Sequence, residues 1–295
     1  PSKPITFVVP FGPGSGSDLI ARIVGQRLST VLGQGVIVEN KPGANGAIAA
    51  VQVARSAPDG YTIFLASNTP MSAAPSLNKS IAYDPIKDFI ALCRIGSFTQ
   101  LLLVNPGVPV KSIEELIAYA KANPGKLSFA SANASSIVAG ETLKRTAGLD
   151  LLHVPYRSSP PAVQDVIGGR VSMLFTDMAT GLPHHKSGAL RGLATTRLQR
   201  SSLVPDLPTL DEAGLKGYEL IAWFAAYAPA KTPKPVIDAL NAAMRKALAD
   251  PEVAPKLLAA GIEPVASSPD ELKTFMISEI EKWRKIAADA KIEPE

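Results

Sequence analysis

The stretch of this sequence best suited to chemistry is a turn rich in glycine and serine, which follows an apolar run and precedes a helical pattern. The glycines are Gly12, Gly14 and Gly16, and the serines are Ser15 and Ser17. Glycine permits positive φ angles and lets a backbone approach a ligand without a side chain in the way. The serines add hydroxyl groups, and Ser17 is placed to cap the helix that follows. The pattern therefore predicts a strand-to-helix turn that presents free backbone amides.

The chemistry that this turn favours is the binding of an anion. Free amides in the first turn of a helix, together with the positive end of the helix dipole, attract negative charge. Phe11 and Asp18 bound the turn, and both belong to the candidate site. A tight turn that merely requires small residues explains the same pattern equally well. Nucleotide binding is disfavoured, because Ser17 replaces the third glycine of G-x-G-x-x-G and no P-loop lysine follows.

Small polar residues also follow two other predicted strands, at residues 61–66 and 127–130. Open α/β sheets bind ligands at the carboxyl ends of their strands. The candidate ligand-binding residues in these two loops are Ser67, Asn68, Thr69, Ser131, Asn133, Ser135 and Ser136. We expect a ligand carboxylate to lie between the glycine turn and the loop at residues 131–136, because both offer amides and hydroxyls. Replacing Gly14 with valine is expected to weaken binding more than replacing Ser15 or Ser135 with alanine.

Charged residues near strand ends have two interpretations each. Asp177 caps a helix that begins near Ala179, which capping preference favours, or accepts a proton from a ligand amine, hydroxyl or second carboxyl. Arg157, next to Tyr156, is a solvated loop charge or a clamp for a distal carboxylate. Asp18 would repel an anion that it faced, so we expect it to neutralise the first-turn amides or tie the loop down.

Several aromatic residues and histidines are also candidates. Those that could line a flat pocket are Phe11, Phe98, Tyr156, Trp223 and Phe224. For Phe98 and Phe224 we favour plain core packing. His153 lies in an apolar strand and reads as a hydrogen-bonded core histidine, and the adjacent pair of His184 and His185 has poor spacing for a shared metal. We predict neither a metal site nor a cofactor.

Composition narrows the function further. The 295 residues have 46% hydrophobic and 19% charged content, which permits a sizeable core and a two-domain chain. The net charge is +4, with the basic residues dispersed, so nothing indicates a nucleic-acid partner. Cys93 is the single cysteine and is expected to be a buried, inert thiol. No run is long enough for a transmembrane helix, and the sequence starts at Pro1, so we expect a signal peptide to be absent from it.

Strands and helices alternate in two successive series, followed by a helical tail from Pro233 to about residue 290. This rhythm predicts an α/β fold with parallel strands covered by helices. We predict two lobes with a ligand cleft between them. Residues 1–103 and 226–295 would form a discontinuous first lobe, and residues 104–225 the second.

A set of motifs gives the chain a family resemblance over nearly its whole length. The motifs are VPFGPGSGSD at residues 9–18, VENKPGANG at 38–46, YDP at 83–85, VPYRSSPPA at 154–162, GGRV at 168–171 and LPTL at 207–210. In this order they resemble the substrate-binding receptors of tripartite tricarboxylate transporters, the Bug family of periplasmic proteins. The chain departs from the usual pattern at Ser15, where glycine is frequent, and in residues 131–136, a loop that is shorter and lacks a histidine.

The resemblance implies a periplasmic-binding-protein-like fold and a receptor that delivers a small mono- or dicarboxylate, aromatic acids included, to membrane transporter subunits. It implies that the loops at residues 11–18 and 131–136 hold the carboxylate, with contributions from residues 67–69 and 156–157. We expect a periplasmic monomer without catalytic residues. The competing interpretation is an enzyme that acts on a small anion at the glycine turn, but no G-x-S-x-G elbow and no Ser/His spacing supports it.

Overall fold

The computed structural model describes residues 2–292, and β1 (Ile5–Val9) lies at the centre of its first group of strands. β1 pairs in parallel with β2 (Val36–Asn40) and with β3 (Thr62–Ser67). Each of these strands is followed by a helical segment, which parallel connections require. These segments are α1 (Gly16–Leu32), η1 (Ala44–Gly46), α2 (Ala47–Ala54), η2 (Thr69–Ala73) and α3 (Ala74–Leu77).

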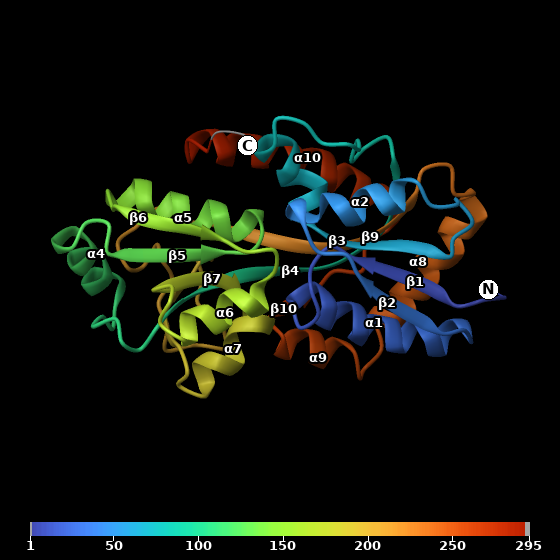
Figure 1. Ribbon diagram of the computed structural model, residues 1–295. Helices are drawn as coiled ribbons and strands as arrows, with labels where there is room; N and C mark the ends of the chain where they lie inside the picture. Colours follow the sequence, from blue (N-terminus) through green and yellow to red (C-terminus); the bar gives the residue numbers. More distant parts are fainter. Residues whose placement is uncertain (1, 293–295) are drawn as a thin grey trace.

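A second group of strands repeats this arrangement. β5 (Leu127–Ser131) lies between β6 (Leu151–Pro155) and β7 (Met173–Asp177), and all three run parallel. The helices of this group are α4 (Ile113–Ala122), α5 (Ala134–Ala147), α6 (Ser159–Ile167) and α7 (Met178–Lys186). Figure 1 shows the two groups of strands side by side.

Two long strands connect the groups. β4 (Phe89–Val104) pairs over residues 89–99 with β9 (Ile221–Pro229), and over residues 100–104 with β7. β9 also pairs with β3, so the strand order runs without a break as β2-β1-β3-β9-β4-β7-β5-β6. The remaining strands, β8 (Arg191–Thr195) and β10 (Ile262–Pro264), both pair with β4. No strand is predicted from the sequence at residues 221–229, where β9 lies. The lobe boundaries stay a prediction.

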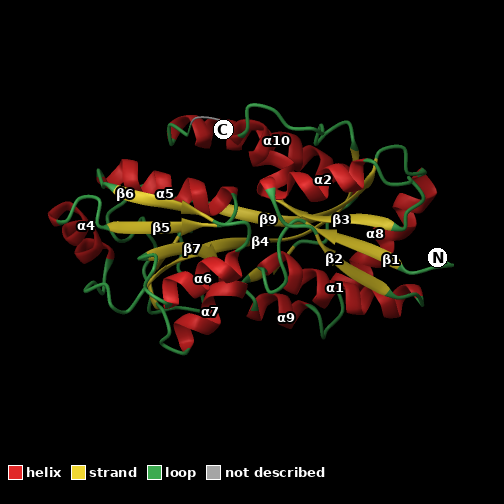
Figure 2. Ribbon diagram, in the orientation of Figure 1, coloured by secondary structure: helices red, strands yellow, loops and turns green. Residues whose placement is uncertain are grey.

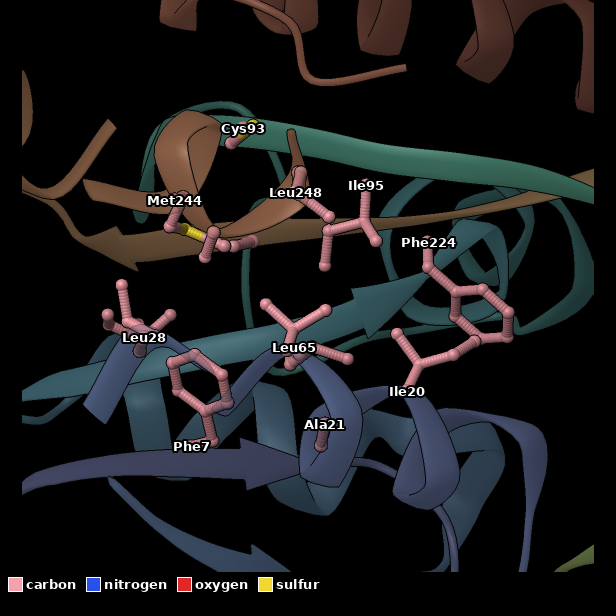
Figure 3. Packing of buried hydrophobic residues seen from close by; sticks show 14 of the residues in the cluster. Phe7, Ile20, Ala21, Leu28, Leu65, Cys93, Ile95, Phe224, Met244 and Leu248 are labelled. Atoms are coloured by element: carbon pink, nitrogen blue, oxygen red, sulfur yellow. The ribbon is translucent and has the colours of Figure 1, made fainter. Parts of the chain in front are cut away.

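Helices cover both faces of the first group, because its strands are apolar on both sides. Phe7 and Leu65 face α1 and α8 (Lys234–Leu248), where they pack with Met244 and Leu248 (Figure 3). Val8 on the opposite face belongs to the cluster that packs under α2 and α10. α9 (Ala254–Ala259) and α10 (Pro269–Asp289) complete the chain, and Figure 2 shows α10 along the same side as α2 and α5.

The single cysteine behaves as its neighbours predict. Cys93 on β4 is fully buried in the same cluster as Phe7. Burial raises the pKa of its thiol to about 12. Because the thiolate is the reactive form, this cysteine is chemically inert at neutral pH.

Candidate functional site

The glycine-rich turn joins β1 to α1, as the sequence predicts, but its cap differs. Ser15, not Ser17, is the N-cap, since its hydroxyl accepts a hydrogen bond from the backbone N–H of Asp18 at 3.4 Å. The helix therefore begins at Gly16, and Ser17 lies inside its first turn. The difference has a local cause, because Ser15 has the extended backbone that a cap requires. The first free backbone N–H groups of α1 are therefore those of Gly16 and Ser17.

Asp18 ties this turn down rather than facing a ligand. Its carboxylate accepts hydrogen bonds from the backbone N–H of Gly14 at 3.0 Å and from Asn40 Nδ2 at 3.0 Å. It also accepts two hydrogen bonds from the guanidinium of Arg22, at 3.0 and 2.9 Å. Burial acts to raise the pKa of Asp18, but the hydrogen bonds from Arg22, Gly14 and Asn40 outweigh it and lower the pKa below 3.8. Asp18 therefore remains ionised and fixes the shape of the turn.

Asp18→Asn is expected to lower the free energy of unfolding by about 1 kcal/mol at pH 7, because the substitution removes the charge that Arg22 bonds. The loss is modest because Arg22 is exposed and solvent weakens its ion pair. A carboxyl whose pKa is lower in the folded than in the unfolded protein stabilises the fold fully above its ordinary pKa. This contribution is complete above pH 3.8 and is lost as the pH falls through the lowered value. Urea denaturation of both proteins from pH 7 to pH 3 measures it. A stability difference that does not shrink in acid would contradict this role.

The polar loop after β5 forms the opposite side of the site. Asn133 is the N-cap of α5, accepting a hydrogen bond from the backbone N–H of Ser136 at 2.9 Å, while the Ser136 hydroxyl accepts from the backbone N–H of Asn133. This capping box starts α5 at Ala134. Ser135 is then in the first turn, where its hydroxyl accepts a hydrogen bond from Asn68 Nδ2 at 3.0 Å. The loops after β3 and β5 therefore meet directly.

Two further helix N-termini close the site, and each contacts a glycine of the turn. Asp177 is the N-cap of α7, as capping preference indicates, and a Cβ on Gly16 would lie 2.6 Å from its Oδ1. A Cβ on Gly12 would lie 2.9 Å from the Oγ of Ser158, the N-cap of α6. The absence of side chains at these glycines thus lets α6 and α7 approach the turn.

The residues gathered in this way line a small cavity of about 10 Å³, room for about one water molecule. Ten of its lining residues are predicted from the sequence: Phe11, Ser15, Gly16, Ser17, Ser67, Asn68, Thr69, Asn133, Ser135 and Asp177. The N-termini of α1, α5, α6 and α7 all contribute to its walls. No lysine, arginine or histidine is among the lining residues, so neutral donors and helix dipoles make this cavity suited to a small anion.

Three cavity residues were missed or assigned elsewhere by sequence reasoning. Phe98 and Phe224 stack with ring centroids 4.4 Å apart, and they belong to the core, as favoured from the sequence, while also lining the cavity. Ser159, in the first turn of α6, is also present. The signal in the sequence that could have found Ser159 is that it follows Ser158, the N-cap of α6. Trp223 does not line the cavity and is buried on β9 against α10.

Other predicted residues lie outside this cavity. Ser131, Tyr156 and Arg157 line a second cavity of about 620 Å³, which Asn133 also borders. There Ser131 Oγ is 2.6 Å from Nε2 of His153, a contact between neighbouring strands that spacing along the chain does not indicate. The Tyr156 hydroxyl donates to Asp165 at 2.6 Å. The predicted residues that line neither cavity are Gly12, Gly14, Asp18 and Ser136.

Within residues 2–292, no group of histidine, cysteine, aspartate and glutamate side chains is arranged to hold a metal ion. None of the helices in that part of the chain has the length and apolar character needed to cross a membrane.

Comparisons with known proteins identify the family of this chain. The model of the tripartite tricarboxylate transporter family receptor matches residues 20–292. BugT of Bordetella pertussis is 35% identical over 292 residues, which cover 98% of this chain and 90% of that protein. An R. palustris structure with adipate is 33% identical with a TM-score of 0.97, covering 100% of this chain and 99% of that one.

A malate-bound MatC structure from Rhodopseudomonas palustris is 32% identical with a TM-score of 0.91, covering 97% of this chain and 99% of that one. The chain shares its α/β fold with solved periplasmic binding proteins, as the sequence predicts. This chain therefore belongs to the tripartite tricarboxylate transporter family of receptors, and it is a solute-binding protein rather than an enzyme.

Proposed function

We propose that this protein binds a small organic carboxylate in the periplasm and delivers it to the subunits of a membrane transporter. The observation that carries the proposal is the convergence of four helix N-termini on one buried cavity without a cationic side chain. Neutral donors hold a carboxylate without the cost of burying a lysine or arginine. The adipate and malate named for the two solved relatives support an acid of this class.

We further propose that the carboxylate closes the protein by contacting both groups of strands. The lobes would comprise residues 1–103 with 226–295, and residues 104–225. Asn68 and Ser135 bond each other across this boundary. A carboxylate that accepts from both sides would stabilise the closed form, since only differential contacts shift such an equilibrium. A monomer is sufficient for this mechanism.

The test is isothermal titration of the purified protein with a panel of mono-, di- and aromatic carboxylates. At least one acid is expected to bind, and the amide of the same acid is expected not to bind, because it lacks the charge. Small-angle scattering should show a smaller radius of gyration when the acid is saturating. A panel in which no acid binds would refute the proposed function.

Ser135→Ala is expected to weaken binding of that acid by roughly 0.5–3 kcal/mol, the range for one lost hydrogen bond. Ser135 is 1% exposed, lines the cavity and lies in the first turn of α5. Ser128→Ala is the matched control, because Ser128 bonds Ser172 away from the cavity. Equal affinities of the two variants would place the carboxylate elsewhere.

A further inference from the structure

The small cavity contains a single ionisable side chain, that of Asp177. All the other polar lining residues are serine, threonine or asparagine. Asp177 is only 4% exposed, and no salt bridge to it occurs within residues 2–292. A buried carboxylate in a cavity built to hold an anion is unfavourable unless something else pairs with it.

The hydrogen bonds of Asp177 leave it able to accept more. Oδ1 accepts from the backbone N–H of Thr180 at 2.9 Å, and Oδ2 accepts from the Thr180 hydroxyl at 3.1 Å. An ionised carboxylate offers about four lone-pair sites on its two oxygens. Burial raises the pKa of Asp177, and the hydrogen bonds from Thr180 and from the backbone N–H groups of Asp177 and Ala179 only partly offset it. Helix capping therefore leaves the ionised carboxylate without a strong partner.

The position of Asp177 specifies where its partner would be on the ligand. Its Oδ1 lies 2.6 Å from the point that a Cβ of Gly16 would occupy, at the N-terminus of α1. An anion held by the first amides of α1 is therefore next to Asp177. The ligand carboxylate and Asp177 would repel each other as neighbouring negative charges. A hydrogen-bond donor on the ligand that bonds Asp177 would offset this repulsion.

We infer that Asp177 selects acids that carry a hydrogen-bond donor, a hydroxyl or an ammonium group, on the carbon next to the bound carboxylate. The donor on the ligand gives its hydrogen bond to Asp177, while the α1 and α5 termini hold the ligand carboxylate. An acid without the donor leaves Asp177 with only its capping hydrogen bonds, beside a second negative charge. This inference rests on the proposed function and narrows its substrate class, placing the chain with malate-type rather than adipate-type acids.

Matched acids that differ by one donor test the inference. Titrations at pH 8 compare malate with succinate, 2-hydroxyadipate with adipate, and aspartate with succinate. The donor-bearing acid of the best-binding pair is expected to bind about ten- to hundredfold more tightly, since hydrogen bonds to charged groups are the stronger ones. The malate and aspartate arms distinguish a hydroxyl from an ammonium donor. Equal affinities within every pair overturn the inference and leave the proposed function intact; if no acid binds, both fail.

Asp177→Asn shows whether Asp177 is responsible for the preference. Asparagine remains a good N-cap, so α7 keeps its start, but one side-chain acceptor becomes a donor. The ratio of affinities within a pair is expected to fall to less than about threefold, through weaker binding of the hydroxy or amino acid. Asp250→Asn is the control, because the Asp250 side chain is also largely buried, at 10% exposed, but pairs with Arg27 and lines no part of this cavity. That variant should keep the ratio; an unchanged ratio in Asp177→Asn would overturn the inference.

Discussion

Replacing Gly16 with valine is expected to weaken carboxylate binding by about a hundredfold, or ~3 kcal/mol, the upper range for overpacking a buried contact. An added Cβ would lie 2.6 Å from Asp177 Oδ1 and 2.8 Å from its Cγ. Asp177 cannot turn aside without giving up its hydrogen bonds to Thr180, which cap α7. The turn and α7 would therefore separate, and one carboxylate could no longer reach the N-termini on both sides.

Isothermal titration with the best acid of the panel measures this loss, and small-angle scattering shows whether the closed form has become wider. Gly35→Val is the matched control, because Gly35 is exposed and its nearest neighbour, Pro4 Cβ, is 3.9 Å away. Unchanged affinity in Gly16→Val would mean that the contact with Asp177 does not limit closure. Gly14 would show a different cause of damage, since its φ of +80° strains any other residue while Pro160 is 3.5 Å away.

The second large effect concerns stability. Trp223→Ala is expected to reduce the free energy of unfolding by about 3–5 kcal/mol, the usual cost of removing a large buried aromatic side chain. Trp223 on β9 is 1% exposed and meets the ring of Phe275 edge-on, with centroids 5.4 Å apart. Its indole N–H donates to Oε2 of the buried Glu279 at 2.9 Å. The substitution leaves a cavity between β9 and α10 and removes a partner of a buried carboxylate.

Urea denaturation followed by circular dichroism measures this change. Trp223→Phe separates the two causes, because it keeps most of the packing and loses only the N–H group. Its expected cost is about 1–3 kcal/mol, for a buried acceptor left with fewer donors. Glu279 would still accept from Trp283 Nε1, at 3.3 Å. A Trp223→Ala protein as stable as the parent would show that β9 and α10 are not held together here.

Local signals in the sequence determined most of the elements. The apolar run before the glycine turn predicts β1, and the strands predicted at residues 61–66 and 127–130 are β3 and β5. The helix starts were predicted less well, because the residue that caps a helix is decided by its backbone conformation. Ser15 and Asn133 have that conformation, and both helices start earlier than their apolar spacing indicates.

The sequence also determined the family and most of the residues around the small cavity. Ten lining residues were predicted because small polar residues at the ends of parallel strands necessarily meet at one edge of a sheet. The family resemblance placed Tyr156 and Arg157 in that group, and they line the larger cavity instead. A residue that follows a strand is known to lie at the edge of the sheet. The sequence does not show toward which of two neighbouring cavities its side chain points.

Only the tertiary structure decided which distant residues touch. The pairing of β9 between β3 and β4 joins residues more than 120 positions apart, and the run at 221–229 carries no turn signal that reveals its partners. The bond between Asn68 and Ser135, and the contact of Gly16 with Asp177, likewise depend on how two groups of strands are set against each other. Such contacts follow from packing across the whole molecule. They determine what the cavity can hold, since they place four helix N-termini and one acidic side chain around the same small space.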